Sequence, residues 1–198
     1  MPQALFSSIP AALAGEVSEN PLISVQDVNP RIRLDIRYAT PDNFMKEILY
    51  PRAVCFLRRE TAAKLSRAQE RLEKMGLGLK IFDGYRPHSV QKKMWARFPI
   101  EGYVANPAKG SNHNRGAAVD VTLVDSKGSE LGMPSAYDEF SERAHRDYAG
   151  GLEAERKNRS ILEEAMQAEG FRGISTEWWH FDDTDAKKYP VLDFPIPE

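Results

Sequence analysis

Two histidines and two carboxylates in this sequence have the types and spacing of a metal site. His113 and Asp120 lie seven positions apart, with Gly116 between them. Asp120 also begins the run Asp120–Val124, whose β-branched and apolar residues predict a strand. A carboxylate at the start of a buried strand is costly unless a cation neutralises it. Seven positions exceed one face of a helix, so a loop must fold back onto the strand, and glycine permits that close approach.

A second stretch near the C-terminus adds another imidazole and another carboxylate. His180 follows Glu177 by three positions, and two tryptophans lie between them. Two histidines and one aspartate leave a fourth position for water, as in catalytic zinc sites, whereas structural zinc sites are closed by four ligands. Cys55 is the only cysteine, which excludes a cysteine-rich structural site. The alternative that His113, Asp120 and His180 are ordinary polar residues stays open on pattern alone.

A metal at these ligands would give Glu177 and Arg86 roles in catalysis. Zinc lowers the pKa of its water to about 7. A carboxylate beside the metal can take a proton from that water and later deliver it to a leaving amine. Arg86 lies in the turn Asp83–Pro87, and its permanent charge suits an oxyanion. Two alternatives stay open: Glu177 as a surface carboxylate, and Arg86 as a structural partner of Asp83.

The remaining histidines and the cysteine are predicted to be structural. His88 lies near the expected start of a helix, and His145 lies in a charged segment, so both are expected to be structural or exposed to solvent. Cys55 is part of the apolar run Ala53–Leu57, where a small buried hydrophobic residue is expected rather than a nucleophile.

Length and composition indicate one globular domain. The chain has 198 residues, of which 41% are hydrophobic and 28% charged. The net charge of −2 gives no reason to expect nucleic acid or an anionic membrane as a partner. No stretch approaches the ~20 apolar residues of a membrane span. We expect a poorly ordered or loosely docked N-terminal arm at 1–22 and a catalytic domain at 23–198.

The N-terminus bears on location. Residues 5–14 are mildly apolar, but no Lys or Arg precedes them, so an arm is favoured over a secretory signal. We therefore expect the cytoplasm, with the periplasm as the alternative.

Periodicity predicts a mixture of helices and strands. Apolar residues at helical spacing predict helices, and alternating or continuous apolar runs predict strands. The expected strands are 31–37, 77–82, 120–124 and 171–181, and the expected helices are 60–75, about 88–98, 137–148 and 161–170. No regular alternation of strand and helix is present. The fold class expected is α+β, with a small central antiparallel sheet flanked by helices.

The motifs together resemble a known family. The pattern Ser111-x-His113-x-x-Gly116-x-Ala118-x-Asp120, with Glu177-x-x-His180 downstream, resembles the zinc D-alanyl-D-alanine dipeptidases of the VanX type. These belong to a wider group of zinc D,D-peptidases that act on peptidoglycan-like peptides. The segments 35–40, 43–44, 84–87 and 138–143 also resemble the dipeptidase branch. The resemblance covers roughly residues 25 to 190.

The resemblance implies an activity and a role for each matching residue. The activity is zinc-dependent hydrolysis of D-Ala-D-Ala to D-alanine, which would serve cell-wall recycling or glycopeptide antibiotic resistance. One Zn²⁺ would be bound by His113, Asp120 and His180, with Glu177 as general base and acid and Arg86 on the scissile carbonyl oxygen and its oxyanion. Asp138 would meet the substrate ammonium, and Ser111 and Tyr38 would line the pocket. The segment 125–150 is then expected to act as a lid.

Two other functions stay open at this point. The first is a zinc D,D-carboxypeptidase or endopeptidase that acts on longer peptidoglycan peptides. The second is a non-catalytic zinc-binding module that binds a peptide, although such a module would need neither Glu177 nor Arg86. The expected partner is a small dipeptide substrate, and a homo-oligomer remains an alternative to a monomer.

Overall fold

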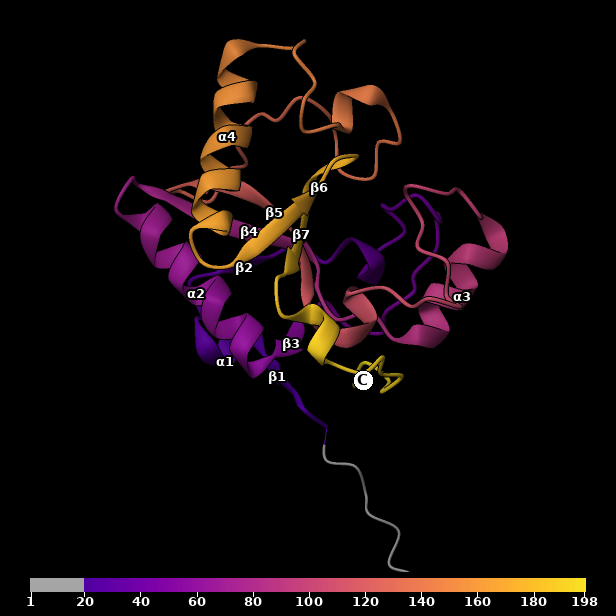
Figure 1. Ribbon diagram of the computed structural model, residues 1–198. Helices are drawn as coiled ribbons and strands as arrows, with labels where there is room; N and C mark the ends of the chain where they lie inside the picture. Colours follow the sequence, from indigo (N-terminus) through magenta and orange to yellow (C-terminus); the bar gives the residue numbers. More distant parts are fainter. Residues whose placement is uncertain (1–19) are drawn as a thin grey trace, which may run out of the picture.

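A five-stranded sheet forms the centre of the protein. The computed structural model describes residues 20–198 (Figure 1). The strand order is β2-β4-β5-β7-β6. The strands are β2 (Arg33–Leu34), β4 (Leu77–Asp83), β5 (Ala118–Asp125), β6 (Phe171–Ile174) and β7 (Glu177–Asp183). Every pair is antiparallel except the parallel pair β2–β4. The α+β class is confirmed, and the antiparallel sheet is correct apart from that one pair.

The two long helices pack against this sheet and against each other. They are α2 (Arg59–Glu73) and α4 (Glu153–Gln167). On α2, Leu65 and Leu72 are fully buried, because seven positions are nearly two turns and leave both side chains on the face toward the sheet. The helices predicted at 60–75 and 161–170 are thus confirmed, although α4 begins earlier than expected.

The shorter elements surround the sheet. Strands β1 (Leu22–Ser24) and β3 (Phe56–Arg58) form a separate two-stranded sheet, and α1 (Val25–Val28) follows β1. Helix α3 (His88–Arg97) confirms the helix predicted from about residue 88. Figure 1 shows α2 and α4 to the left of the strands and α3, with its loops, to the right.

The helix predicted at 137–148 is wrong. This segment is irregular apart from a 3₁₀ turn at Glu142–Ala144. Asp138 has a φ of 58°, a left-handed conformation that interrupts a helix. Two backbone carbonyls of the segment are bonded from outside it, since Arg159 donates to the carbonyl oxygens of His145 and Tyr148. The apolar spacing is helical, but the Arg159 side chain pairs with two of the carbonyl groups that a helix would use.

Two strand predictions also need correction. Only Arg33–Leu34 of the strand predicted at 31–37 pairs with a neighbour, because the chain leaves the sheet edge at Ile36 and enters a 3₁₀ turn at Arg37–Ala39. The strand predicted at 171–181 is two strands, β6 and β7, which form an antiparallel hairpin.

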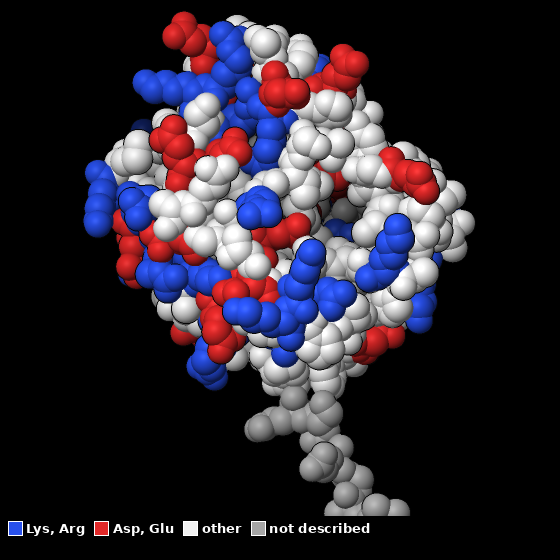
Figure 2. All heavy atoms as spheres, in the orientation of Figure 1, with Lys and Arg blue, Asp and Glu red and all other residues white. Residues whose placement is uncertain are grey.

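The N-terminal arm and the surface complete the description. Most of the arm expected at 1–22 lies outside the described residues, and Leu22 already belongs to β1. Among residues 20–198, no helix has the length and apolar character needed to span a membrane. Positive and negative side chains are mixed over the face shown in Figure 2, so no patch of one sign dominates it.

Candidate metal centre

Strand register brings two of the predicted metal ligands together. Asp120 on β5 lies directly opposite His180 on β7. Opposite residues of an antiparallel pair point to the same face of the sheet, so their side chains meet. His113 comes from a 3₁₀ turn that ends at Gly116, whose φ is 68°. A Cβ at Gly116 would collide with the side chain of Leu22, so glycine is required there for both conformation and space.

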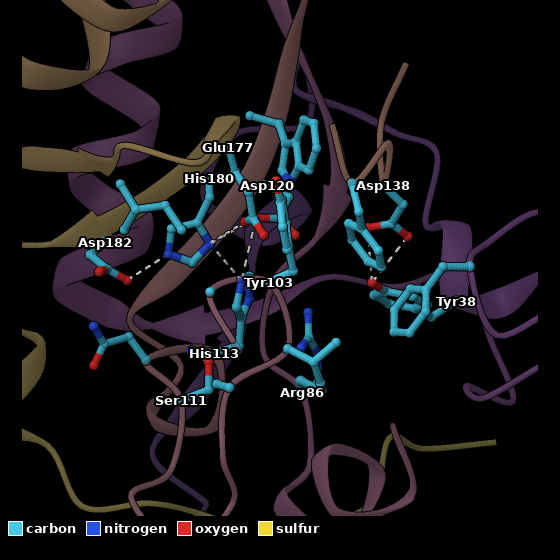
Figure 3. Close-up of a pocket in the computed structure, with 18 of the residues that line it drawn as sticks. Tyr38, Arg86, Tyr103, Ser111, His113, Asp120, Asp138, Glu177, His180 and Asp182 are labelled. Atoms are coloured by element: carbon cyan, nitrogen blue, oxygen red, sulfur yellow. Dashed lines mark hydrogen bonds and ion pairs between the residues drawn. The ribbon is translucent and has the colours of Figure 1, made fainter. Parts of the chain in front are cut away.

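Three potential metal-ligand atoms of these residues lie within hydrogen-bond distance of one another. His113 Nε2 lies 3.1 Å from His180 Nδ1 and 3.3 Å from Asp120 Oδ1. His180 Nδ1 lies 3.1 Å from the same Asp120 oxygen (Figure 3). All three side chains are buried. The predicted ligand set is therefore assembled in one place, as the residue types of a zinc site require.

Hydrogen bonds on the far side of each imidazole indicate which nitrogen holds a lone pair. His113 Nδ1 lies 2.7 Å from the carbonyl oxygen of Gly84, an acceptor, so it donates its proton there. His180 Nε2 lies 2.9 Å from Asp182 Oδ1 and donates to it. The two nitrogens that face each other then both carry lone pairs, beside a carboxylate oxygen. Three acceptors with no proton between them require a cation, so the residues fit a divalent metal.

The pKa values of the ligands show the same demand for positive charge. Burial acts to lower the pKa of His180, but hydrogen bonds with Asp120 and Asp182 outweigh it and raise the pKa to about 10. Burial acts to raise the pKa of Asp120, yet the two imidazoles hold it well below its usual range. A metal ion at these ligands would supply that positive charge.

Glu177 lies beside the ligands without being one of them. It begins β7, and its Oε2 lies 4.0 Å from His180 Nδ1. Burial raises the pKa of Glu177 to about 8. A cation at the neighbouring ligands would favour the ionised carboxylate and lower that pKa. The position and the environment suit a base that acts near neutral pH.

The structure confirms Asp83 as a structural partner of Arg86, and the role of Arg86 at an oxyanion stays a prediction. Its Nη2 donates to Asp83 Oδ2 at 2.7 Å, and its Nε donates to the same oxygen at 3.0 Å. Its Nη1 donates to Gln91 Oε1 at 2.8 Å. The guanidinium is thus held in place by its structural partners, and it also lines the same cavity as the metal ligands.

One cavity contains every site residue predicted from the sequence. It has a volume of about 320 Å³. Its lining includes Tyr38, Arg86, Ser111, His113, Asp120, Asp138, Glu177 and His180. The Tyr38 hydroxyl donates to Asp138 Oδ2 at 3.2 Å, and burial raises the pKa of Asp138 to about 8. The Ser111 hydroxyl accepts a hydrogen bond from the backbone N–H of His113.

The aromatic side chains at the cavity bear on the expected lid. The Phe140 ring lies 4.9 Å from that of Tyr103 and 5.3 Å from that of Phe44. Part of the segment 125–150 therefore forms a wall of the cavity, and its movement as a lid stays a prediction.

His145 contacts the Tyr103 hydroxyl and His88 contacts the Pro107 carbonyl oxygen, both away from the metal ligands, as expected. Cys55 is a buried free thiol, also as expected.

The sequence interpretation missed Asp182 and Gln91. Asp182 was detectable, because it lies two positions after His180 in a strand and so shares its face. The partners of Arg86 had a weaker signal. Asp83 was considered as a partner, but Gln91 reaches the guanidinium from α3, a contact that local pattern does not reveal.

Replacing Asp182 by Ala is expected to weaken zinc binding about 10- to 100-fold, the usual effect of losing an outer partner of a metal-bound histidine. The Ala variant leaves His180 Nε2 without its acceptor. Asp182→Asn keeps an oxygen acceptor at the same place and is expected to lose less. Competition with a chromophoric chelator measures both affinities. Zinc binding by the Ala variant as tight as in the parent protein would contradict the role.

Comparisons with known protein sequences identify D-alanyl-D-alanine dipeptidases as relatives of this chain. The peptidase M15 family described as D-ala-D-ala dipeptidase matches residues 18–197. The D-alanyl-D-alanine dipeptidase of Escherichia coli K12 is 36% identical over 171 residues, which cover 86% of this chain and 89% of that protein. The D-alanyl-D-alanine dipeptidase of Enterococcus faecalis V583 is 31% identical over 91% of this chain and 96% of its own length.

A solved structure of the vancomycin resistance D,D-pentapeptidase VanY with Zn(II) is more distant. It is 17% identical, covers 68% of this chain and 78% of its own, and has a TM-score of 0.38. At that level of similarity it carries no weight for this chain.

Proposed function

The chain belongs to the peptidase M15 family of D-Ala-D-Ala dipeptidases, and on this premise we propose that it hydrolyses D-Ala-D-Ala to two molecules of D-alanine with one Zn²⁺ per chain. The observation that supports the proposal most strongly is the buried triangle of three acceptor atoms in one cavity with Glu177 and Arg86. Such a triangle needs a cation, and a carboxylate and a guanidinium beside a cation are the parts that amide hydrolysis uses.

The ion would be held by His113, Asp120 and His180. A zinc ion at these ligands would lower the pKa of water and polarise a carbonyl group. Glu177 takes the proton of the attacking water as the new C–O bond forms. It then gives that proton to the amine nitrogen as the C–N bond breaks, so one residue acts as base and then acid. The products are two alanine molecules, and Glu177 returns to its starting charge.

Arg86 acts on the oxygen of the scissile carbonyl group. That oxygen gains negative charge during attack, and a fixed cation stabilises it without reorganisation. Asp83 and Gln91 hold the guanidinium through three hydrogen bonds before substrate binds. The guanidinium is thus preorganised, which is what stabilisation of a transition state requires.

Asp138 receives the free ammonium of the dipeptide. Its carboxyl lies in the cavity and accepts a hydrogen bond from Tyr38, and burial raises its pKa to about 8. An ammonium group beside it favours the ionised carboxylate and forms an ion pair. A substrate without that charge leaves a buried polar group poorly paired, so the cavity discriminates against N-blocked peptides.

Replacing Asp138 by Asn is expected to raise KM for D-Ala-D-Ala about 10- to 100-fold, the equivalent of the ~1.5–3 kcal/mol of a hydrogen bond to a charged group. Asn is the matched substitution, because it tolerates the left-handed φ of 58° found at this position. Steady-state kinetics measure the effect, with zinc content confirmed to be that of the parent protein. An unchanged KM would remove Asp138 from ammonium binding.

The main alternative activity is cleavage of the C-terminal residue of longer D,D-peptides. D-alanine release is compared for D-Ala-D-Ala, N-acetyl-D-Ala-D-Ala and L-Ala-L-Ala. We expect cleavage of the free D,D dipeptide and rejection of the other two. Cleavage of the acetylated substrate would instead support a carboxypeptidase. No cleavage of any substrate by zinc-loaded protein would support a non-catalytic module.

A further inference from the structure

The second oxygen of Asp120 has a partner of its own. Asp120 Oδ1 faces both imidazoles, whereas Oδ2 accepts a hydrogen bond of 3.0 Å from the Tyr137 hydroxyl. We propose that Tyr137 is a positioning residue that keeps Asp120 a one-oxygen metal ligand. The proposal rests on the proposed function only for its kinetic consequences, since metal binding itself can be measured without substrate.

The Tyr137 ring is held by packing that does not involve its hydroxyl. Its centroid lies 4.6 Å from that of Phe82, with the planes 31° apart, and 5.3 Å from that of Trp179 at 70°. Offset and edge-to-face contacts of this kind stabilise an aromatic ring by about 0.5–1.5 kcal/mol each beyond the area they bury. The hydroxyl is therefore presented to Asp120 by a ring whose position is already fixed.

The hydrogen bond determines which oxygen of Asp120 is free for a metal. A carboxylate with both oxygens free can bind a cation through one or both of them. Tyr137 occupies a lone pair of Oδ2 and leaves Oδ1 beside the two imidazole nitrogens. Three single-atom ligands leave the fourth tetrahedral position of a catalytic zinc for water. Loss of the Tyr137 hydroxyl would let Oδ2 compete for that position.

With Tyr137, each of the three ligands has one outer partner. His113 donates to the carbonyl oxygen of Gly84, and His180 donates to Asp182. The third ligand accepts from Tyr137. Outer partners orient metal ligands, and losing one typically costs about 10- to 100-fold in metal affinity. Tyr137 therefore gives Asp120 the kind of outer hydrogen-bond partner that both histidines already have.

A neighbouring tyrosine provides a matched comparison. The Tyr38 hydroxyl lies 3.4 Å from that of Tyr137, but its own hydrogen bond goes to Asp138 rather than Asp120. Two adjacent hydroxyls thus serve two different carboxylates, one at the metal and one at the ammonium site. Removing each hydroxyl in turn should affect different properties of the enzyme.

The test compares three Tyr→Phe variants, each of which removes one hydrogen-bonded hydroxyl and keeps its ring. Tyr137→Phe is expected to weaken zinc binding about tenfold or more and to change KM less than threefold once zinc is saturating. Tyr38→Phe is expected to raise KM and to leave zinc affinity nearly unchanged. Tyr85→Phe, whose hydroxyl donates to the Phe194 carbonyl oxygen rather than to a carboxylate, is expected to change neither zinc affinity nor KM. Chelator competition gives the zinc affinities.

The visible absorption spectrum of the Co²⁺-loaded protein gives a second readout. Tyr137→Phe should shift that spectrum toward a higher coordination number, because Oδ2 is freed, whereas Tyr38→Phe and Tyr85→Phe should not. Zinc affinity of Tyr137→Phe within twofold of the parent, with an unchanged Co²⁺ spectrum, would overturn the inference. That result would not contradict the dipeptidase proposal. If the zinc affinities are as predicted but D-Ala-D-Ala is not cleaved, the role of Tyr137 is supported and the dipeptidase proposal is contradicted.

Discussion

Replacing Glu177 by Gln is expected to lower kcat for D-Ala-D-Ala by about 10²- to 10⁴-fold, the range that a positioned acid or base contributes. Gln has nearly the same size and keeps a hydrogen-bonding oxygen, but it can neither take the proton of water nor return it to the leaving amine. Glu177 is not one of the three ligands, so zinc content is expected to be unchanged. The kinetics are therefore measured on protein with one zinc per chain.

The Glu177 experiment separates catalysis from metal binding. A variant that lost both zinc and activity would show only that the carboxylate supports the site. A zinc-loaded Glu177→Gln protein that kept kcat within tenfold of the parent would show that another group moves the proton, and the proposed mechanism would then be wrong.

Replacing Arg86 by Lys is expected to lower kcat about 10²- to 10³-fold, the usual cost of removing one donor to a developing oxyanion. Lys keeps the charge but not the planar fork that binds Asp83 through two nitrogens and Gln91 through a third. The charge would no longer be held in place before the reaction. Steady-state kinetics on the folded, zinc-loaded variant measure the loss.

The Arg86 result needs a control for stability. Asp83 is fully buried, and the loss of a partner from a buried ion pair costs about 3–5 kcal/mol. Gln91→Ala leaves the Asp83–Arg86 pair intact and removes only one guanidinium contact, so a smaller loss of kcat is expected. Wild-type kcat in Arg86→Lys would show that the guanidinium is structural only.

The ligands were predictable because their chemistry is rare and strand geometry is simple. The sequence contains only four histidines. Two of them, His113 and His180, lie within seven positions of a carboxylate near a predicted strand. The register of β5 and β7 then places Asp120 and His180 opposite each other. Gly116 was interpreted correctly as the residue that lets the loop return, since it has a left-handed φ and no room for a Cβ.

Features that depend on distant contacts were not predictable from local pattern. The apolar spacing of 137–148 fits a helix, but Arg159 from α4 pairs with two carbonyl groups of that segment and Asp138 turns the chain. The role proposed for Asp138 came from the family resemblance alone. Tyr137 gave no signal in the sequence, because its partner Asp120 is 17 positions away and only the fold joins them.

The most direct test of zinc-dependent dipeptidase activity is D-alanine release from D-Ala-D-Ala by metal-free protein titrated with zinc. We expect no release without metal, a rise in rate in proportion to added zinc, and a break at one zinc per chain. Full activity without zinc, or no activity with one zinc bound per chain, would contradict zinc-dependent dipeptidase activity.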